Sequence, residues 1–176
     1  PAVLRAAFVR DPAADRHADL AAALDPAGAA GLLAFAGDLP LPHALHLGGG
    51  PLLAIPGLNT ITVVLEFTGL PAAAIASLPL QWSAHDGADF RPCAAAIFTE
   101  PAGDRIRLRA ALTGLPALPP ADVGGHRDRW LRAALDPAAL ATWWLTYFAV
   151  QDAPIASPAD QIAALPHVLS ASLDLT

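Results

Sequence analysis

Short apolar runs alternate with turn residues from Leu39 to the C-terminal end of the chain. Within residues 105–110, three arginines occupy alternate positions, and Ile106 and Leu108 lie between them. A period of two is typical of a strand that buries one face. Regularly spaced runs of this kind, with turns between them, predict a mainly β fold, an antiparallel, jelly-roll-like β-sandwich with one or two short helices. Strands are expected at residues 43–48, 60–67, 79–85, 93–98, 105–110, 129–135 and 167–175. In the last run, alternation places Val168 on the face of Ser170, Ser172 and Asp174.

Two segments carry helix signals. Each begins with an Asp-Pro pair, which suits an N-cap followed by the first helical position. One helix is expected from Asp11 to about residue 24, after a strand or short helix at 2–9, and the other at about 137–150. We therefore divide the chain into an N-terminal helical or strand lead-in at 1–38 and a β-sandwich domain at 39–176 with a helical insertion. The proline-rich residues 115–120 suggest a long exposed connection.

The amino-acid composition argues against several classes of function. The 176 residues are 55% hydrophobic and 15% charged, contain no Lys and carry a net charge of -6, whereas nucleic-acid binding needs a basic face. Cys93 is the single cysteine, which excludes an internal disulfide and a cysteine-rich zinc site. The longest strongly apolar stretch, 138–150, is shorter than the roughly 20 residues of a bilayer span. The first residues also lack a signal-peptide pattern.

The histidines give little support to metal chemistry. His43 and His46 are three apart in an expected strand, which puts them on opposite faces. His126 lies in an arginine-rich segment that we interpret as a flexible, solvated loop. Asp86 and Asp89 share one turn and could at most form a weak calcium site; the sequence His-Asp-Gly at 85–87 is more simply a hairpin turn.

Catalytic motifs are also absent from the sequence. The chain has no G-x-S-x-G, S-x-x-K, G-x-G-x-x-G or Walker-type loop. Cys93 follows a proline at an expected strand start, where a buried structural thiol is the default. Nothing in the sequence brings Glu66 and Glu100, the only glutamates, together as a glycosidase pair. We therefore expect a protein without enzymatic activity and without a cofactor.

The tryptophans indicate core and contact positions. Trp82 and Trp130 each have apolar neighbours two residues away, as expected of core aromatics in a sandwich. Trp143 and Trp144 are adjacent on the second expected helix, so only one can point squarely at the core. The other, together with Tyr147, would be partly exposed. Such aromatics favour a protein contact, while packing of both tryptophans on the sheet and a carbohydrate platform are the alternatives.

Three segments, 33–67, 78–92 and 129–135, contain a series of short motifs. Their residues are Phe35, Gly37, Pro42, Leu45, Leu47, Gly48, Pro56, Gly57, Trp82, Asp86, Gly87, Phe90, Arg91, Pro92, Gly125, Trp130, Leu131, Arg132 and Leu135. This series resembles wedge-type baseplate proteins of phage-like contractile injection systems, which have an F-G, P, L-x-L-G stretch followed by P-G, then a W…D-G…W-R-P hairpin, and later G-x-W-L-R…L. The chain departs from the family in Phe90, where a tryptophan is usual, in the helix at 137–150, and in being much shorter.

The resemblance implies a structural assembly module in a baseplate, with other baseplate or tail proteins, or a second copy of the chain, as partners. It also implies assembly in the cytoplasm and presence in a released extracellular particle. Six matching residues, Trp82, Asp86, Gly87, Phe90, Trp130 and Arg132, are then fold-making, and Trp143, Trp144 and Tyr147 are the candidate interface. The alternative is a carbohydrate- or ligand-binding sandwich. Buried Trp82 and Trp130 would favour the structural interpretation, whereas two aromatic rings lining one open groove would favour sugar binding.

Overall fold

A computed structural model of the chain describes residues 6–11, 16–19, 44–68, 70–147 and 167–175. These residues form twelve strands, two α-helices and one 3-10 turn at Leu52–Ala54. The strands are β1 Ala6–Asp11, β2 Arg16–Asp19, β3 Ala44–Gly48, β4 Thr60–Thr68, β5 Leu80–His85, β6 Phe90–Pro92, β7 Ala94–Ala102, β8 Arg105–Thr113, β9 Ala121–Val123, β10 His126–Asp128, β11 Trp130–Leu135 and β12 His167–Leu175. The helices are α1 Ala72–Ala76 and α2 Pro137–Tyr147.

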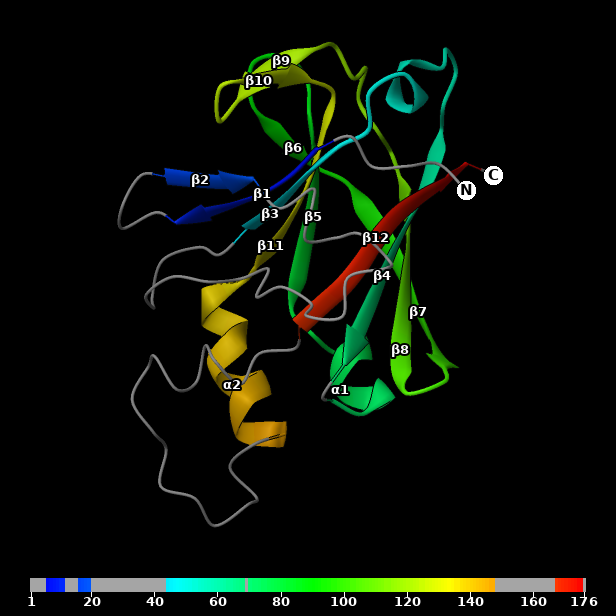
Figure 1. Ribbon diagram of the computed structural model, residues 1–176, viewed down its shortest axis with the longest axis vertical. Coiled ribbons are helices and arrows are strands. Elements are labelled where there is room, and N and C mark those ends of the chain that lie inside the picture. The colour runs from blue at the N-terminus through cyan, green and yellow to red at the C-terminus, as the bar shows by residue number, and fades with distance from the viewer. Residues whose placement is uncertain (1–5, 12–15, 20–43, 69, 148–166, 176) are drawn as a thin grey trace.

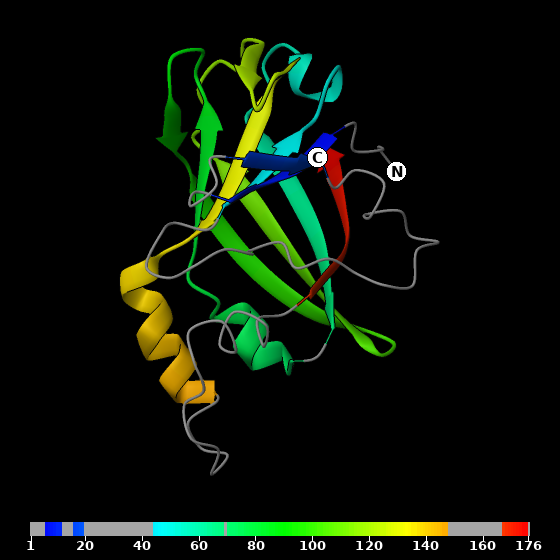
Figure 2. The ribbon, with the colours of Figure 1, turned by 60° about the vertical axis from the view of Figure 1, so that its left-hand side comes forward.

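Two antiparallel sheets form the two layers of the fold (Figures 1 and 2). One has the strand order β2-β1-β3-β11-β5-β6, and the other has the order β12-β4-β8-β7. The chain crosses between the layers after β3, β4, β6 and β11, and it does so again between β8 and β11 through the small β9–β10 hairpin. Such crossings are typical of Greek-key and jelly-roll sandwiches. The expected mainly β, antiparallel fold with one or two short helices is confirmed, although α1 was not one of the helices expected.

The apolar faces of both sheets share one core. Side chains from β3, β5 and β11 meet those from β4, β8 and β12, and the largest fully buried members of this core are Phe67, Leu45, Leu47, Ile61, Leu65, Ile75, Leu108, Leu112 and Leu131. Alternation along β8 explains how the sequence buries one face of a strand and exposes the other. Leu108, Ala110 and Leu112 are buried, whereas Arg107 and Arg109 remain on the outer face. Apolar burial of this kind contributes roughly 25 cal/mol per Å².

The prediction of a helix at 11–24 is wrong for the part of this range that the structure describes. Asp11 ends β1 and residues 16–19 form β2, and the two strands pair antiparallel. β1 also pairs with β3, placing Ala6 opposite Gly48, so the lead-in contributes strands to the larger sheet. Main-chain pairing across the sheet has overridden the helix propensity of an alanine-rich segment. Residues 20–24 of the expected helix lie outside the described residues.

The last strand matches its expected bounds, but its faces differ from simple alternation. The register between β12 and β4 shifts between Val168 and Ser170, which leaves Leu169 as the extra residue of a β-bulge. The bulge turns Val168 to the core side, where it is fully buried together with Leu173. The sequence placed Val168 with the polar residues because a bulge leaves no signal in the alternation itself.

The structure also corrects one expectation, around His126, and adds detail to another, at the start of α2. The arginine-rich segment around His126 is a regular hairpin rather than a flexible loop, since β9 and β10 pair across Gly124 and Gly125, both with positive φ. Helix α2 begins after Asp136, whose Oδ1 accepts hydrogen bonds from the N–H groups of Ala138 (2.9 Å) and Ala139 (3.4 Å). None of the described helices has the length and apolar character needed to cross a membrane.

Candidate functional site

The β5–β6 hairpin gathers several of the residues singled out in the sequence. Asp86 opens its loop, and Oδ1 of Asp86 accepts hydrogen bonds from the N–H groups of Ala88 and Asp89, each at 2.8 Å. The Asp86 N–H donates to the carbonyl of Asp89 (3.0 Å), and Gly87 adopts φ +102°. The predicted turn is confirmed, and its loop spans the four residues 86–89, between the paired residues His85 and Phe90.

The same carboxylate makes an ion pair with the returning strand. Nε of Arg91 lies 2.7 Å from Oδ2 of Asp86. This bond and the two backbone N–H donors hold the pKa of Asp86 well below its usual range. Both carboxylate oxygens are thus engaged in the turn. In the described part of the chain no group of three or more His, Cys, Asp or Glu side chains could hold a metal ion.

Arg132 and Phe90 form the centre of an aromatic cluster. The guanidinium carbon of Arg132 lies 4.3 Å from the centroid of the Phe90 ring, a cation–π arrangement. His46 and His85 meet the same ring edge-on, with centroids 5.3 and 4.9 Å away. His85 Nδ1 accepts a hydrogen bond from the N–H of Gly87 (3.0 Å), which ties the cluster to the turn. His43 lies outside the described residues.

Trp82 and Trp130 are both buried, as the structural interpretation requires. Trp130 is 0% exposed, and its Nε1 donates to the carbonyl of Ala121 at 2.9 Å. It packs with Ala121, Val123 and Phe90, and so joins the β9–β10 hairpin to the larger sheet. Trp82 is 4% exposed and belongs to the main core.

The aromatic residues of α2 differ in burial, but all three contact the core. Trp143 is 5% exposed and donates from Nε1 to the carbonyl of Ala74 (3.0 Å), so its indole is part of the core. Trp144 and Tyr147 are partly buried and pack against that core. The Tyr147 hydroxyl lies 2.9 Å from the Ser77 hydroxyl and 3.2 Å from the carbonyl of Ala73. Of the three proposed interface residues, Trp143 is therefore not available to a partner.

The outer face of the smaller sheet carries a charge network that sequence reasoning missed. The register places Arg107 opposite both glutamates, Glu66 on β4 and Glu100 on β7. Nη2 of Arg107 lies 2.8 Å from Glu66 and its Nη1 lies 3.1 Å from Glu100. Arg105 also contacts Glu66, at 3.2 Å. The hydrogen bond from Arg107, the largest effect, lowers the pKa of Glu66 against the opposing effect of burial. The two acids are thus brought together, but as ion-pair partners of arginine.

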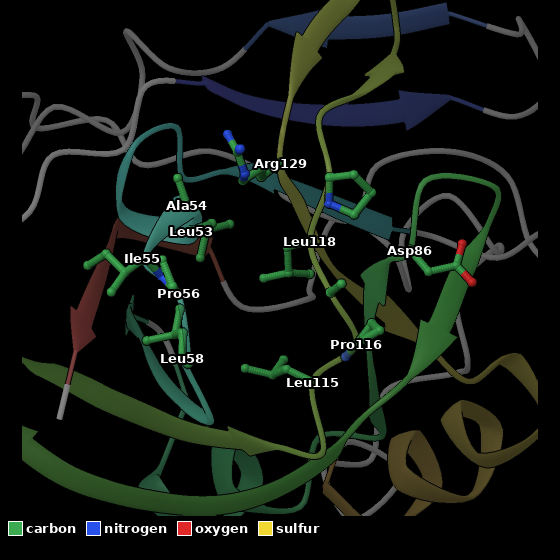
Figure 3. Close-up of a pocket in the computed structure, with 13 residues that line it drawn as sticks. Leu53, Ala54, Ile55, Pro56, Leu58, Asp86, Leu115, Pro116, Leu118 and Arg129 are labelled. Carbon is green, nitrogen blue, oxygen red and sulfur yellow. The ribbon is translucent and has the colours of Figure 1, made fainter.

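A pocket of about 450 Å³ lies between the loop after β3 and the proline-rich connection (Figure 3). Leu53, Leu58, Leu115 and Leu118 surround its centre, and Asp86 and Arg129 stand at its rim. The lining contains no aromatic ring. An open, aliphatic hollow of this kind offers little to recognise a sugar, which stacks on aromatic faces.

A second cavity, of about 490 Å³, lies where the edges of the two sheets approach each other. β5 contributes Trp82 and Ser83, β7 contributes Ala95 and Ile97, and Arg132 projects from β11. Cys93, at the crossing from β6 to β7, is half-buried, and burial raises the pKa of its thiol. Trp82 is the single aromatic residue of the lining. Neither pocket described here has the two aromatic rings that the sugar-binding alternative requires.

β7 forms one border of this second cavity and is a free edge of its sheet. Its nine residues pair with β8 on one side, and no described strand pairs with the other side. Ala94, Ala95 and Ala96 are exposed, and Phe98 is 62% exposed. The sequence identified 93–98 as a strand but gave no indication that it would lie at an edge, since that depends on pairing between distant segments.

Comparison with known proteins found no match: no protein-family model, no curated protein and no solved structure is significantly similar to the chain.

Proposed function

We propose that the chain is a non-enzymatic assembly module that works through protein–protein contacts, with β7 accepting an extended strand of a neighbouring subunit. The observation that carries this proposal is the uncharged first part of β7, Ala94–Thr99, in which every residue except Ile97 and Thr99 is exposed. A sheet edge presents unpaired N–H and C=O groups, and natural proteins blunt such edges with charges, prolines, bulges or short length. An unprotected edge can instead bind a partner strand through main-chain hydrogen bonds.

Comparison of the four outer strands supports the choice of β7. The sequence of β2, Arg-His-Ala-Asp, is mostly charged or polar. β6 has three residues, two of which are Arg91 and Pro92. β12 carries Asp174 and a bulge. In β7, Glu100 and Pro101 stand only near the far end, so six consecutive residues carry no charge, no proline and no bulge.

Helix α2 adds a second surface suited to contacts. None of its eleven residues is charged, and Leu145 is 53% exposed. Tyr147 and Trp144 border this surface as partly buried aromatics. Uncharged surface of this kind loses little side-chain entropy when a partner covers it.

The proposed setting is the baseplate of a phage-tail-like contractile injection system, and its support is the resemblance given above. Trp82 and Trp130 are buried, and Asp86, Gly87 and Phe90 build a hairpin. These are the roles that the matching residues would have in a shared fold. The partners would be other baseplate or tail proteins or a second copy, assembled in the cytoplasm and carried in a released particle.

Size-exclusion chromatography with light scattering tests this proposal, on the chain alone and mixed with candidate baseplate neighbours. We expect a defined oligomer or a stable mixed complex. The variant Ala96→Lys, which places a charge on the exposed edge, should reduce complex formation. Thr113→Lys is the matched control, since Thr113 is also exposed but lies on β8, which is paired on both sides.

A chain that remains monomeric with every neighbour would contradict the proposal. Equal loss of complex in both lysine variants would contradict the role of β7, because a general charge effect would then explain the loss. In the first case a glycan array would test the carbohydrate-binding alternative next.

A further inference from the structure

The register between β7 and β8 determines which main-chain groups of β7 face its free edge. In an antiparallel ladder, alternate residues direct both their N–H and their C=O to one neighbouring strand, and the residues between them direct theirs to the other side. Residues 103 and 104 form a two-residue loop, so the closing pair, Ala102 and Arg105, is hydrogen-bonded and the even-numbered residues of β7 bond to β8. Pro101, which has no N–H, belongs to the odd-numbered set, as expected of a proline in an edge strand. The other odd-numbered residues, whose N–H and C=O groups point to the free edge, are Ala95, Ile97 and Thr99.

These three positions are symmetric about Ile97. When a second copy of β7 lies antiparallel to the first, with Ile97 opposite Ile97, Ala95 of each copy lies opposite Thr99 of the other. Each of these pairs exchanges two N–H···O=C bonds, so the edge N–H and C=O groups of all three residues are satisfied in both strands. Pro101 stays outside this ladder, where its missing N–H costs nothing.

The neighbouring registers lose hydrogen bonds. The same main-chain groups can pair only in steps of two residues, because the edge-facing groups alternate. A step in one direction brings Pro101 opposite Ala95, whose carbonyl then has no donor. A step in the other direction brings Cys93 opposite Thr99, and the N–H of Cys93 already donates to the carbonyl of Trp82 (3.0 Å). Pairing centred on Ile97 is therefore the most favourable of the three registers.

The side chains of the outer face fit the same register. It places Phe98 of each copy opposite Ala96 of the other, in a non-hydrogen-bonded pair, where opposed side chains lie closest. Phe98 is 62% exposed and Ala96 is also exposed, so both are available to a partner. The two Phe98 rings become diagonal neighbours at roughly 7–8 Å, within reach of each other. A small residue thus stands where the ring of the other copy needs space.

Neither charge nor the inner face opposes this pairing. Glu100 is the only ionisable residue of β7, and it lies opposite Ala94 of the second copy, so the two carboxylates are not brought together. Its own ion pair with Arg107, at 3.1 Å, is on the β8 side and is left intact. On the inner face, the two Ile97 side chains meet beside the cavities that they line. The pairing therefore joins apolar residues to apolar residues on both faces.

We propose that the neighbouring subunit accepted by β7 is a second copy of this chain, paired antiparallel about a two-fold axis at Ile97. This inference rests on the proposed function, because it names the partner of the same edge. The smaller sheets of the two copies would join into one continuous sheet through β7. A two-fold contact uses the same edge of both copies and is closed, so it produces dimers and no larger assembly.

Sedimentation velocity of the chain alone, over about a hundredfold range of concentration, tests for this dimer. We expect a monomer–dimer equilibrium without larger species. Phe98→Ala should weaken dimerisation about tenfold or more, because two rings lose their contacts in each dimer. Leu145→Ala is the matched control, since Leu145 is also an exposed apolar residue (53%) but lies on α2. A chain that stays monomeric throughout, or an equal loss in Leu145→Ala, would overturn the proposal.

Disulfide trapping tests the register. In a Cys93→Ala background, Ala96→Cys and Phe98→Cys are made in separate chains. The proposed register opposes these two positions directly, with Cα atoms about 4.5 Å apart, which suits a disulfide. Oxidation of the mixed chains should give a cross-linked dimer, whereas either variant alone should give far less. Cross-linking of either variant with itself, to the level reached by the mixture, would contradict the two-fold axis at Ile97.

Failure of this inference is distinguishable from failure of the proposed function. A chain that is monomeric alone, but forms a complex with a baseplate neighbour that is lost in Ala96→Lys and kept in Thr113→Lys, would retain the strand-accepting edge and exclude a second copy as its partner. Dimerisation unchanged by both Phe98→Ala and Ala96→Lys would place the contact away from β7. That result would overturn both the inference and the role proposed for this edge.

Discussion

Two buried tryptophans, Trp130 and Trp82, allow the contribution of one hydrogen bond to stability to be measured against an otherwise similar site. Trp130 and Trp82 are 0% and 4% exposed, so a change of either residue to Phe removes the same atoms from a similarly buried place. The loss of apolar burial and the cavity left behind should therefore be comparable in the two variants. The difference is the indole N–H, which donates to the carbonyl of Ala121 at 2.9 Å in Trp130 and has no acceptor among the described residues in Trp82.

Trp130→Phe leaves the carbonyl of Ala121 without this donor in a residue that is only 8% exposed. An unsatisfied buried acceptor costs about 1–3 kcal/mol. Trp82→Phe removes an N–H donor that has no acceptor among the described residues, so this substitution leaves no buried acceptor unsatisfied. We expect Trp130→Phe to lower the free energy of unfolding by about 1–3 kcal/mol more than Trp82→Phe does. At about 2–4 °C per kcal/mol for a chain of this size, the difference in melting temperature is several degrees.

Urea unfolding followed by far-ultraviolet circular dichroism measures both variants without depending on tryptophan emission. The slopes of the unfolding free energy against urea should be unchanged, so that the midpoints report stability alone. Free energies that agree within about 0.5 kcal/mol would refute the reasoning, because the hydrogen bond would then have no net value. A larger loss in Trp82→Phe would contradict the assignment of Trp82 Nε1 as a donor without an acceptor.

Two further predictions concern the turn and the charge network. Gly87→Ala should destabilise the chain more than Gly103→Ala in the same urea assay: both glycines have positive φ, but a Cβ at Gly87 would lie 2.9 Å from Pro119, whereas Gly103 has open space. Equal losses would show that backbone strain alone, about 1–2 kcal/mol, decides the effect. Glu66→Gln should cost roughly 1 kcal/mol near neutral pH. Arg107 lowers the pKa of Glu66 in the folded state. The ion pair's contribution to the free energy of unfolding is therefore complete above the ordinary pKa of Glu66 and is lost as the pH falls through the lower pKa of the folded state. Urea midpoints of Glu66→Gln and the unchanged chain should therefore converge in acid; a constant gap would contradict the ion-pair explanation.

Local patterns were sufficient for most of the strands. The expected run at 105–110 became β8 because its arginines and apolar residues alternate, and 167–175 matches β12 residue for residue. The Asp136 cap and the turn at Asp86 and Gly87 could likewise be predicted from the sequence, since capping and turn formation depend on a few neighbouring residues. These are the features in which neighbours in sequence determine the conformation.

Features that depend on pairing between segments far apart in the sequence could not be predicted from local patterns. The helix expected from Asp11 failed because β1 gains main-chain partners in β3, more than thirty residues later in the chain. The meeting of Glu66 and Glu100 at Arg107 depends on the registers of two strand pairs. A shift of one residue in either register would turn the side chains to the other face, and nothing in the local sequence specifies those registers.

An uncharged edge strand is a liability for a protein that acts alone. The first part of β7, Ala94–Thr99, exposes the chain to unwanted pairing. The other outer strands each have a protective feature: charged residues in β2, Arg91 and Pro92 in β6, and Asp174 with a bulge in β12. A partner strand on β7 would remove this liability, because it would satisfy the edge through main-chain hydrogen bonds.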